Sequence, residues 1–499
     1  MTDSRPSPSI SAAQGRVLHE LGRNQRGAQP PVGDVASFTC EQAADQINGG
    51  YHRWRDSNSD GKIELSYEFS RSRKVDIDAL NETVGQRYGI KNFSEFCERQ
   101  KQQTRLSQQS WSDVAQVTFA EKPGGDGQLR YVNYTSNVEK SGTAGFAFFP
   151  DPDGYPNDPG LRKLQGSVWI NTINHGEKID SPRLNNHARQ TLTHEVGHAL
   201  GLLHPGDYES DTQQLLPDPR TYKEDTHRFS VMSYNPGYFS LNDQAELIYP
   251  SAPMVDDIRA VQNLYGANYE TRKDNTTYGF NSNTDRDFYS LKSATDTPVF
   301  TIWDGGGRDT LDLSRFSQDQ TINLNAGAYS SAAGLGGNIG IAEGVTIEEA
   351  IGGSGSDLLI GNNAPNVLRG GAGDDIIYGG VGGDNDLLGG AGSDTFVFDQ
   401  QSVGRPNWVM DFVSGRDKID LCAVRQHVGR LNFVRQLTVD QSKPQNPDDP
   451  TYITKAGDAC VSFDAESRRT LIRIDTTGNG QMDMQLHIFG RVVRKDVIT

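Results

Sequence analysis

Three histidines and one glutamate stand within eleven residues of the chain, His194-Glu195-Val196-Gly197-His198-Ala199-Leu200-Gly201-Leu202-Leu203-His204. Residues four apart lie one above the other on a helix, so His194 and His198 can bind a single Zn²⁺ together. Gly201 can leave the helix with a left-handed backbone, which predicts that His204 returns as a third ligand. Three protein ligands leave one coordination position for water, as in catalytic zinc sites.

Glu195 favours a catalytic over a structural zinc site. Bound zinc lowers the pKa of water to about 7, and a neighbouring carboxylate can take its proton during attack on a carbonyl. A structural site has no use for such a base. The apolar residues share the other face of the helix, which predicts that this face is buried and that the two imidazoles point outward. These apolar residues are Leu192, Val196, Ala199 and Leu203.

A nine-residue glycine-rich repeat occupies part of the second half. It begins at Gly352, restarts at Gly361, Gly370 and Gly379, and restarts after ten residues at Gly389. The period predicts a parallel β-helix coil that binds Ca²⁺ through carboxylates and backbone carbonyls, whereas a flexible linker would not keep its aspartates in phase. The extra residue should perturb one turn. The sixth places of the units hold Asp357, Asn366, Asp375, Asp384 and Asp394.

Composition excludes several classes of protein. The 499 residues include 48 basic and 65 acidic side chains, a net charge of −17, which argues against a nucleic-acid partner. No apolar run approaches the ~18 residues of a membrane span, and the N-terminus lacks an apolar secretory signal. Because 23 of the 54 glycines lie between Gly305 and Gly392, the chain has two regions of different character.

Helices and strands alternate in the first region. The first thirty-odd residues are rich in Ser, Pro, Gln and Gly, which predicts a leader with little core. Thr39 and Gln42 form a capping-box signature before a short helix, and longer helical patterns cover Phe93 to Ala115 and Pro253 to Tyr265. Everything beyond Asp304 is predicted to be β. Strands are predicted at Ile63 to Phe69, Val117 to Glu121, Leu129 to Tyr134, Gly145 to Phe149 and Ser167 to Ile170.

Two features allow more than one interpretation. Residues Asp56 to Gly61 resemble the opening of an EF-hand loop, but the twelfth place holds Tyr67, so a polar turn before a strand is favoured. The cysteines lack zinc-ribbon or CxxC spacing, and both local disulfides and free thiols stay open. They are Cys40, Cys97, Cys422 and Cys460.

The zinc string is the metzincin signature, and Ser230-Val231-Met232-Ser233-Tyr234 resembles the methionine turn that lies beneath the zinc in that clan. Together with the repeats, the chain resembles the serralysin family of secreted bacterial metalloproteases over roughly Gly15 to Ile498. The likeness implies an α/β metzincin-type catalytic domain followed by an all-β domain, a parallel β-roll with a β-sandwich. It divides the chain into a propeptide (residues 1–15), a zinc metalloprotease domain (16–267) and a calcium-binding domain (268–499).

The resemblance also implies roles for individual residues. His194, His198, His204 and Tyr234 are similar to the family's zinc ligands, and Glu195 to its base. Tyr234 would then move aside and stabilise the oxyanion. Met232 would form an apolar floor, and residues Gly145 to Pro150 correspond to the edge strand that holds an extended substrate. Asn235 stands where an aromatic residue is common, which predicts an altered preference in the adjoining subsite.

Several structural Ca²⁺ ions are implied at matching positions, in part through backbone carbonyls. In the linker, the stretch Arg272-Lys273-Asp274-Asn275 replaces a glycine and an aspartate of the family, a departure at that calcium site. Before the repeats the positions are Arg272, Asp274, Thr276, Asp304, Gly306, Gly307, Asp309, Thr346 and Glu348. Within the repeats, at about 352–397, they are Gly353, Gly355, Asp357, Asn362, Ala364, Asn366, Gly370, Gly371, Ala372, Gly373, Asp375, Gly379, Val381, Asp384 and Asp394.

The likeness implies a secreted, extracellular, monomeric zymogen that cuts polypeptides with broad specificity. Export would use type I secretion machinery that recognises an uncleaved C-terminal signal ending Asp496-Val497-Ile498-Thr499. A small protein inhibitor is a further expected partner, whereas nucleic acid and a membrane span are not expected. The alternative is a calcium-dependent RTX adhesin or binding protein with an inactive zinc domain. Glu195 and Tyr234 speak against it.

Overall fold

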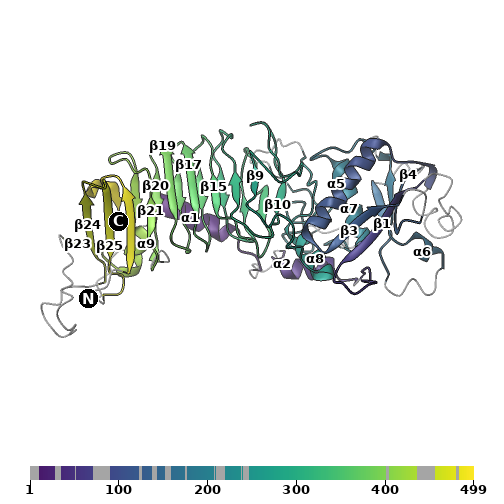
Figure 1. Cartoon of the computed structure of the whole chain (residues 1–499), viewed down its shortest axis with the longest axis horizontal. Coiled ribbons are helices and arrows are strands. Elements are labelled where there is room, and N and C mark those ends of the chain that lie inside the picture. Colours follow the sequence, from purple (N-terminus) through teal and green to yellow (C-terminus); the bar gives the residue numbers. More distant parts are fainter. Residues whose placement is uncertain are drawn as a thin grey trace.

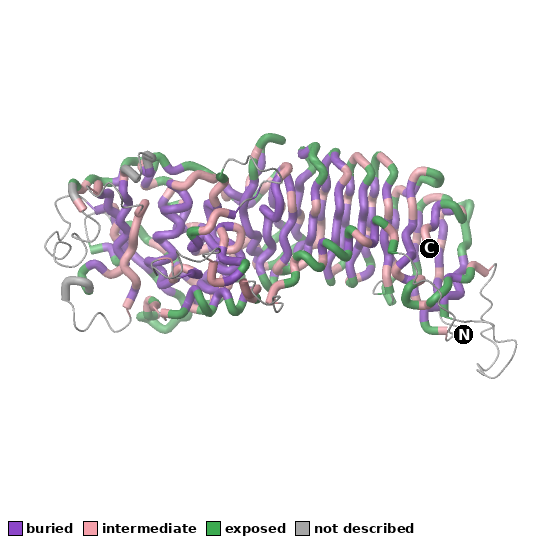
Figure 2. Tube along the Cα trace, turned by 180° about the vertical axis from the view of Figure 1, so that it is seen from behind, coloured by how far each residue is buried: buried purple, intermediate pink, exposed green. Residues whose placement is uncertain are grey.

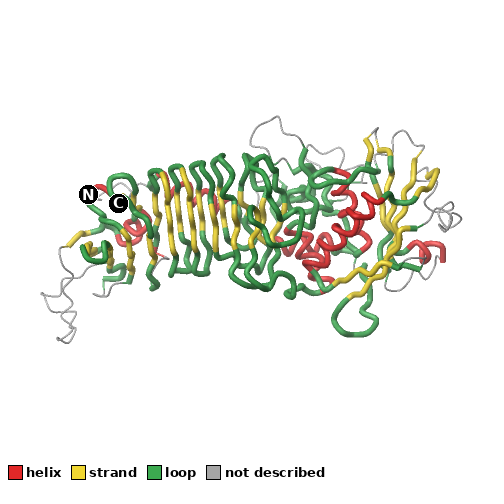
Figure 3. The backbone as a smooth tube through the Cα atoms, turned by 45° about the horizontal axis from the view of Figure 1, so that its top comes forward, coloured by secondary structure: helices red, strands yellow, loops and turns green. Residues whose placement is uncertain are grey.

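The computed structural model places helices and a mixed sheet at one end of an elongated molecule and stacked strands along the rest (Figures 1 and 3). It describes residues 10–27, 35–50, 52–70, 90–122, 126–136, 143–151, 159–174, 177–206, 208, 220–237, 239, 247–400, 404–434, 456–478 and 483–499.

The sheet of the first region has the order β3-β1-β4-β6-β5, with β2 beside β4. Strands β3, β1, β4 and β6 run parallel to one another. Strand β2 pairs antiparallel with β4, and β5 pairs antiparallel with β6 at the edge. All five predicted strands are confirmed, although the last residues of the predicted edge strand continue as loop. The strands are β1 (Ile63–Phe69), β2 (Ile90–Ser94), β3 (Val117–Glu121), β4 (Leu129–Ser136), β5 (Gly145–Ala147) and β6 (Ser167–Asn171). A short hairpin, β7 (Ile173–Asn174) and β8 (Glu177–Lys178), follows.

Four longer helices and the short α6 (Pro159–Leu164) accompany this sheet: α2 (Cys40–Ile47), α5 (Glu98–Val114), α7 (His187–Ala199) and α8 (Val255–Tyr265). The capping box of Thr39 and Gln42 forms as predicted. Helix α5 begins later than predicted because Ile90–Ser94 pairs with β4 as a strand. Trp111 of α5 donates its indole N–H to the Thr193 carbonyl, which fixes α5 against α7.

The sequence predicted a leader with little core at the N-terminus. This prediction is wrong for residues Ala12–Arg23, which form helix α1 and bury part of its surface. Ser11 caps this helix by accepting a hydrogen bond from the Gln14 backbone. Val17, 3% exposed, packs with Ala13 on one face of the C-terminal region. The helix is amphipathic despite its polar composition, because Ala13, Val17 and the partly buried Leu21 together cover one apolar strip. The residues it covers are Leu358, Ile360, Ile376, Tyr378 and Val397.

Successive strands of the second region alternate between two largely parallel sheets. One contains β9 (Thr277–Gly279), β11 (Thr310–Asp312), β15 (Glu349–Ile351), β17 (Val367–Ala372), β19 (Asp386–Ala391) and β21 (Asn407–Val409), extended by β26 (Met484–Phe489), β25 (Arg469–Ile474), β24 (Asp458–Asp464) and β23 (Asn432–Val434). The other contains β12 (Thr321–Asn323), β16 (Leu358–Ile360), β18 (Ile376–Tyr378), β20 (Thr395–Val397), β22 (Lys418–Asp420) and β27 (Val497–Ile498). Buried residues run between them (Figure 2).

Two short helical elements correct the all-β prediction for this region. A helix, α9 (Cys422–Val428), and a 3₁₀ turn, η4 (Arg494–Asp496), interrupt the strands near the C-terminus. A small third sheet, β10 (Phe300–Ile302), β14 (Ile339–Ile341) and β13 (Tyr329–Ser330), lies near the first region.

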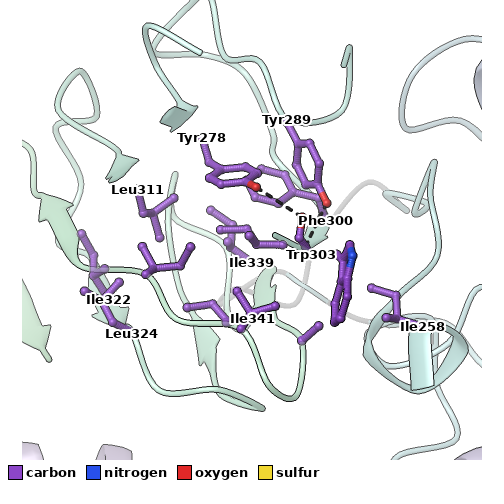
Figure 4. Close-up of a cluster of buried hydrophobic side chains, with 14 of the residues drawn as sticks. Ile258, Tyr278, Tyr289, Phe300, Trp303, Leu311, Ile322, Leu324, Ile339 and Ile341 are labelled. Atoms are coloured by element: carbon purple, nitrogen blue, oxygen red, sulfur yellow. Dashed lines mark hydrogen bonds between the residues drawn. The ribbon is translucent and has the colours of Figure 1, made fainter. Parts of the chain in front are cut away.

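One hydrophobic cluster crosses the junction between the regions. Figure 4 shows Ile258 of α8 beside Trp303, which belongs to the same buried group as Tyr278, Tyr289 and Phe300. The Tyr289 hydroxyl donates to the Thr301 carbonyl. The two regions therefore share a core rather than meeting only through a linker.

An ion-pair network strengthens the same junction. Asp113 of α5 binds Arg272 at 2.8 Å and Arg286 at 2.7 Å, and all three side chains are largely buried. Paired charges of this kind are costly to separate because each would be left buried without its partner.

Several smaller expectations are resolved. Asp56 accepts hydrogen bonds from the backbones of Asn58, Ser59 and Gly61, so this segment is the favoured polar turn before β1. The four cysteines are free thiols. Among the described residues, none of the helices is both long and apolar enough to cross a membrane.

We predict that Val17→Asp lowers the free energy of unfolding of the full chain by about 2–4 kcal/mol, because it buries an unpaired charge under α1. Leu18→Asp is the matched control, since Leu18 is 50% exposed on the same helix. It should change stability by less than about 0.5 kcal/mol. Denaturant unfolding of calcium-loaded protein measures both, and equal effects would contradict the docking of α1.

Candidate metal centre

Helix α7 is enclosed on all sides, and its histidines are buried rather than facing solvent as the sequence predicted. His194 and His198 are 4% and 7% exposed. The end of the helix is held by side chains from elsewhere, since Trp54 donates to the Ala199 carbonyl and Tyr265 to the Leu200 carbonyl. The imidazoles face a cleft covered by β5 and neighbouring loops, which a helical pattern alone does not indicate.

The three predicted histidine ligands converge on one point. Nε2 of His204 lies 3.2 Å from Nε2 of His194 and 3.0 Å from Nε2 of His198. A tetrahedral zinc ion with Zn–N distances of ~2.0–2.1 Å separates two ligand nitrogens by roughly 3.3 Å. Among the described residues, this trio is the only group of three or more His, Cys, Asp or Glu side chains gathered closely enough for a metal.

Backbone carbonyls set the tautomers of two of these histidines. Nδ1 of His194 lies 3.0 Å from the Val231 carbonyl, and Nδ1 of His198 lies 2.6 Å from the Leu202 carbonyl. A carbonyl only accepts, so each Nδ1 carries the proton and each Nε2 presents a lone pair to the shared point. The donor set therefore fits a cation such as zinc.

The charge state of the histidines agrees with metal binding. Burial, followed by the influence of His204, lowers the pKa of His198 to about 3. Burial also lowers the pKa values of His194 and His204. All three imidazoles are thus neutral near pH 7, which is the form that binds a metal.

Two glycines allow the chain to form this centre. Gly201 has φ +106°, and a Cβ there would lie 2.0 Å from the His52 carbonyl oxygen. The predicted turn toward His204 therefore requires glycine. A Cβ on Gly197 would lie 2.5 Å from Sδ of Met232, so the buried methionine packs directly beneath α7.

Asp257 of α8 holds the turn that contains Met232. Its carboxylate accepts hydrogen bonds from the Ser230 hydroxyl, at 2.6 Å, and from the Val231 backbone N–H, also at 2.6 Å. The Val231 carbonyl then fixes His194. Burial raises the pKa of Asp257 to about 7. Sequence reasoning missed this residue, because its connection to the zinc ligands appears only in the folded chain.

Glu195 lies at the wall of a cleft of about 430 Å³ that also contains His198, His204 and Tyr234. The cleft is bordered by β5, and a Cβ on Gly145 would lie 2.9 Å from Oε1 of Glu195. Oε2 of Glu195 is buried without a hydrogen-bond partner among the described residues. Burial raises the pKa of this carboxyl well above its usual value, an effect that a nearby cation would oppose.

Tyr234 is 56% exposed and lies against the histidines. Its ring centroid is 4.4 Å from that of His204 and 5.7 Å from that of His194. The side chain therefore occupies the cleft in which sequence reasoning placed it. A second tyrosine of the cleft, Tyr208, was missed because the eleven-residue string ends at His204.

The predicted calcium positions before the repeats lie close together at the start of the second region. Asp304 and Asp309 are buried, and Glu348 accepts a hydrogen bond from the Asp309 backbone. Oδ2 of Asp309 has no hydrogen-bond partner among the described residues, and burial with repulsion from Asp304 raises the pKa of Asp309 to about 8. Arg272 binds Asp113 and the Trp303 carbonyl with its guanidinium, so only its backbone carbonyl is available to a cation.

Within the repeats, each first-place glycine lies against a sixth-place acid or amide. A Cβ on Gly370 would lie 2.2 Å from Oδ2 of Asp375, and the same arrangement recurs in the other units. Asp375 and Asp394 each keep one buried carboxylate oxygen without a partner among the described residues. Burial and neighbouring aspartates raise the pKa of Asp375 to about 8, so these carboxylates fit a cation that would neutralise them.

The fourth repeat corrects the predicted phase by one residue. Asn385 lies 2.6 Å from a Cβ built on Gly379 and accepts a hydrogen bond from the Asn366 backbone. Asp384, with φ +55°, projects outward to within 3.8 Å of Arg405. The extra residue is thus accommodated as a local outward bend, and Asn385 takes the place predicted for Asp384.

The remaining predicted calcium positions are distributed over the same stack of turns. Asn362 and Asn366 are buried amides hydrogen-bonded to each other and to the Ile347 carbonyl. Val381 is 39% exposed, so only its backbone is suited to an ion. Gly371 and Ala372 are the last residues of β17. The other positions lie in the glycine-rich turns: Gly353, Gly355, Ala364 and Gly373.

Comparison with known proteins gives a consistent result. A family model described as "Peptidase M10 serralysin C terminal" matches residues 267–499. The chain is 41% identical to "Metallopeptidase AprA" of Pseudomonas marginalis over 100% of both chains. It is 43% identical to "Serralysin" of Photorhabdus luminescens over 80% of each chain, and 40% identical to "Serralysin A" of Dickeya chrysanthemi over 98% and 96% of the two chains.

Similarity of this extent across the whole length, together with the three converging histidines, leaves one assignment. The chain is a metalloendopeptidase and belongs to the serralysin family.

Proposed function

We propose that the chain is a secreted zinc-dependent endopeptidase that hydrolyses peptide bonds in polypeptides with broad specificity. The observation that carries this proposal is the convergence of Nε2 atoms from His194, His198 and His204 beside the unpartnered carboxylate of Glu195. Bound zinc would supply electrophilic polarisation of the substrate carbonyl and a lower pKa for water.

Glu195 is the proposed base. Glu195 follows His194 in sequence, and its buried carboxylate lines the same cleft as His198 and His204. A carboxylate in this position can take a proton from water and deliver it to the leaving amine. Because the side chain already packs against Gly145, its orientation is set before substrate binds.

Strand β5 is the proposed substrate platform. It is the last strand of its sheet and pairs only with β6 among the described strands, so its outer edge can accept an extended peptide as an additional antiparallel strand. This edge runs along the cleft that contains Glu195. Tyr234 would join the three histidines in holding zinc, and its hydroxyl would stabilise the oxyanion.

Calcium is proposed as the structural ion of the second region, with the positions named above as ligands. The support is the set of buried, unpaired carboxylate oxygens on Asp309, Asp375 and Asp394. Ions at these places would join successive turns of a parallel β-roll. Since calcium is scarce in cytoplasm, the region would complete folding outside the cell.

The remaining assignments follow from the family and stay proposals. They are a metzincin-type catalytic domain at residues 16–267, a calcium-binding domain at 268–499, a propeptide at 1–15, and a C-terminal signal for type I secretion. Cutting after residue 15 would remove the first turn of α1, which begins at Ala12. A small protein inhibitor of the cleft and a monomeric state belong to the same proposal.

The first test is Glu195→Gln, which keeps the shape of the side chain and removes the base. We expect casein hydrolysis to fall by about 10²–10⁴-fold in kcat/KM, with unchanged zinc content measured by atomic absorption. Glu98→Gln, an exposed glutamate on α5, is the control that should keep full activity. Normal hydrolysis by zinc-loaded Glu195→Gln would show that Glu195 is not the base.

Calcium binding should depend on pH, because Asp309 and Asp375 have pKa values raised to about 8 in the calcium-free fold. Calcium binds ionised carboxylates, so it must displace protons below about pH 8, and its apparent affinity should rise from pH 6 to pH 8. In the absence of calcium, raising the pH over this window lowers the free energy of unfolding. The folded state holds protons on these carboxyls that the unfolded chain releases.

Isothermal titration calorimetry in two buffers of different ionisation enthalpy counts the protons released by calcium. Asp375→Asn should release fewer protons than the natural chain at pH 7, while Asp464→Asn, at the exposed end of β24, should match it. Equal proton release at pH 6 and pH 8.5 would rule out raised carboxyl pKa values at the calcium positions.

A further inference from the structure

Three aromatic rings form one cluster at the cleft. The rings of Tyr208 and Tyr234 are stacked, with centroids 4.6 Å apart and planes inclined by 20°. His204 contacts both, with its centroid 4.4 Å from Tyr234 and 5.5 Å from Tyr208. Tyr208 therefore occupies the space beside Tyr234 into which that ring could otherwise turn.

Tyr208 is itself held by the turn that carries Tyr234. Its hydroxyl donates to Oδ1 of Asp225 at 2.5 Å, and the Ser233 hydroxyl donates to the same oxygen at 2.7 Å. The Asn235 backbone N–H donates to the Ser233 hydroxyl at 3.0 Å. Both sequence neighbours of Tyr234 thus belong to the network that anchors Tyr208.

This network is buried and closely packed. Asp225 is 0% exposed, and burial together with this carboxylate raises the pKa of the Tyr208 hydroxyl, which keeps it a donor. A Cβ on Gly206 would lie 2.6 Å from the Tyr208 ring and 2.9 Å from Oδ2 of Asp225. The backbone at Gly206 therefore lies against both groups, which leaves the Tyr208 ring little room to rotate.

We propose that Tyr208 is a positioning residue that restricts where the Tyr234 ring can lie beside the histidine cluster, and that Asp225 holds Tyr208 in place. This inference rests on the proposed role of Tyr234. An exposed phenol has several rotamers of similar energy. Stacking on a fixed ring removes those that point away from the histidines, so the hydroxyl is placed before the reaction begins.

The test compares Tyr208→Ala with Tyr208→Phe, which keeps the ring and removes its anchor. Tyr208→Ala should lower kcat by about tenfold and change KM by less than about twofold, because a misplaced oxyanion donor affects the transition state rather than substrate binding. Tyr208→Phe should give a smaller loss. The control is Tyr222→Phe, since the buried Tyr222 hydroxyl has no hydrogen-bond partner among the described residues, and it should keep full activity.

A double-variant cycle identifies the residue through which Tyr208 acts. In a Tyr234→Phe background, Tyr208→Ala should cause no further loss of kcat. Zinc retention against a chelator gives a second readout: Tyr208→Ala and Tyr234→Phe should weaken it alike, and the double variant no more than either.

The outcomes separate the inference from the proposed function. If Tyr234→Phe lowers kcat while Tyr208→Ala does not, the inference is overturned and the role of Tyr234 stands. Additive losses in the double variant would also overturn it, because they would show that Tyr208 supports the fold independently. If Tyr234→Phe leaves kcat unchanged, both the role of Tyr234 and the inference fail.

Discussion

The convergence of three neutral imidazoles is the constraint on which the rest of the first region depends. Two Nδ1–H groups donate to backbone carbonyls, those of Val231 and Leu202, and this alone turns the Nε2 lone pairs inward. Nε2 of His204 lies 3.2 Å and 3.0 Å from these two nitrogens, so all three rings meet at one point. The arrangement therefore suits a metal ion, and the fold around it keeps those carbonyls in place.

The supports of this site come from distant parts of the chain. Asp257 of α8 fixes the turn at Val231, and Trp54 and Tyr265 hold the carbonyls at the end of α7. Helix α8 also packs its Ile258 into the core that continues into the C-terminal sheets. The second region can thus influence the rigidity of the histidine cluster through this shared core.

Local signals predicted a large part of this structure. Spacing alone predicted that the three histidines converge, and Gly201 marked the turn, because those features depend on helix geometry and backbone conformation. The period-2 patterns found all five predicted strands. Composition failed at α1, where the few apolar residues Ala13, Val17 and Leu21 dock an otherwise polar helix. The helical pattern failed at Ile90–Ser94, because their strand partner β4 lies more than thirty residues away. The repeat period failed at Asp384, because the position of an inserted residue depends on packing. Tyr208 and Asp257 were missed because they meet the site only through tertiary contacts.

A crystal structure of the purified, calcium-loaded protein, with anomalous data collected on both sides of the zinc absorption edge, tests the central claim most directly. The account predicts a single zinc peak at about 2.0–2.1 Å from Nε2 of His194, His198 and His204. Absence of that peak, or a peak with His204 turned away from it, would contradict the account.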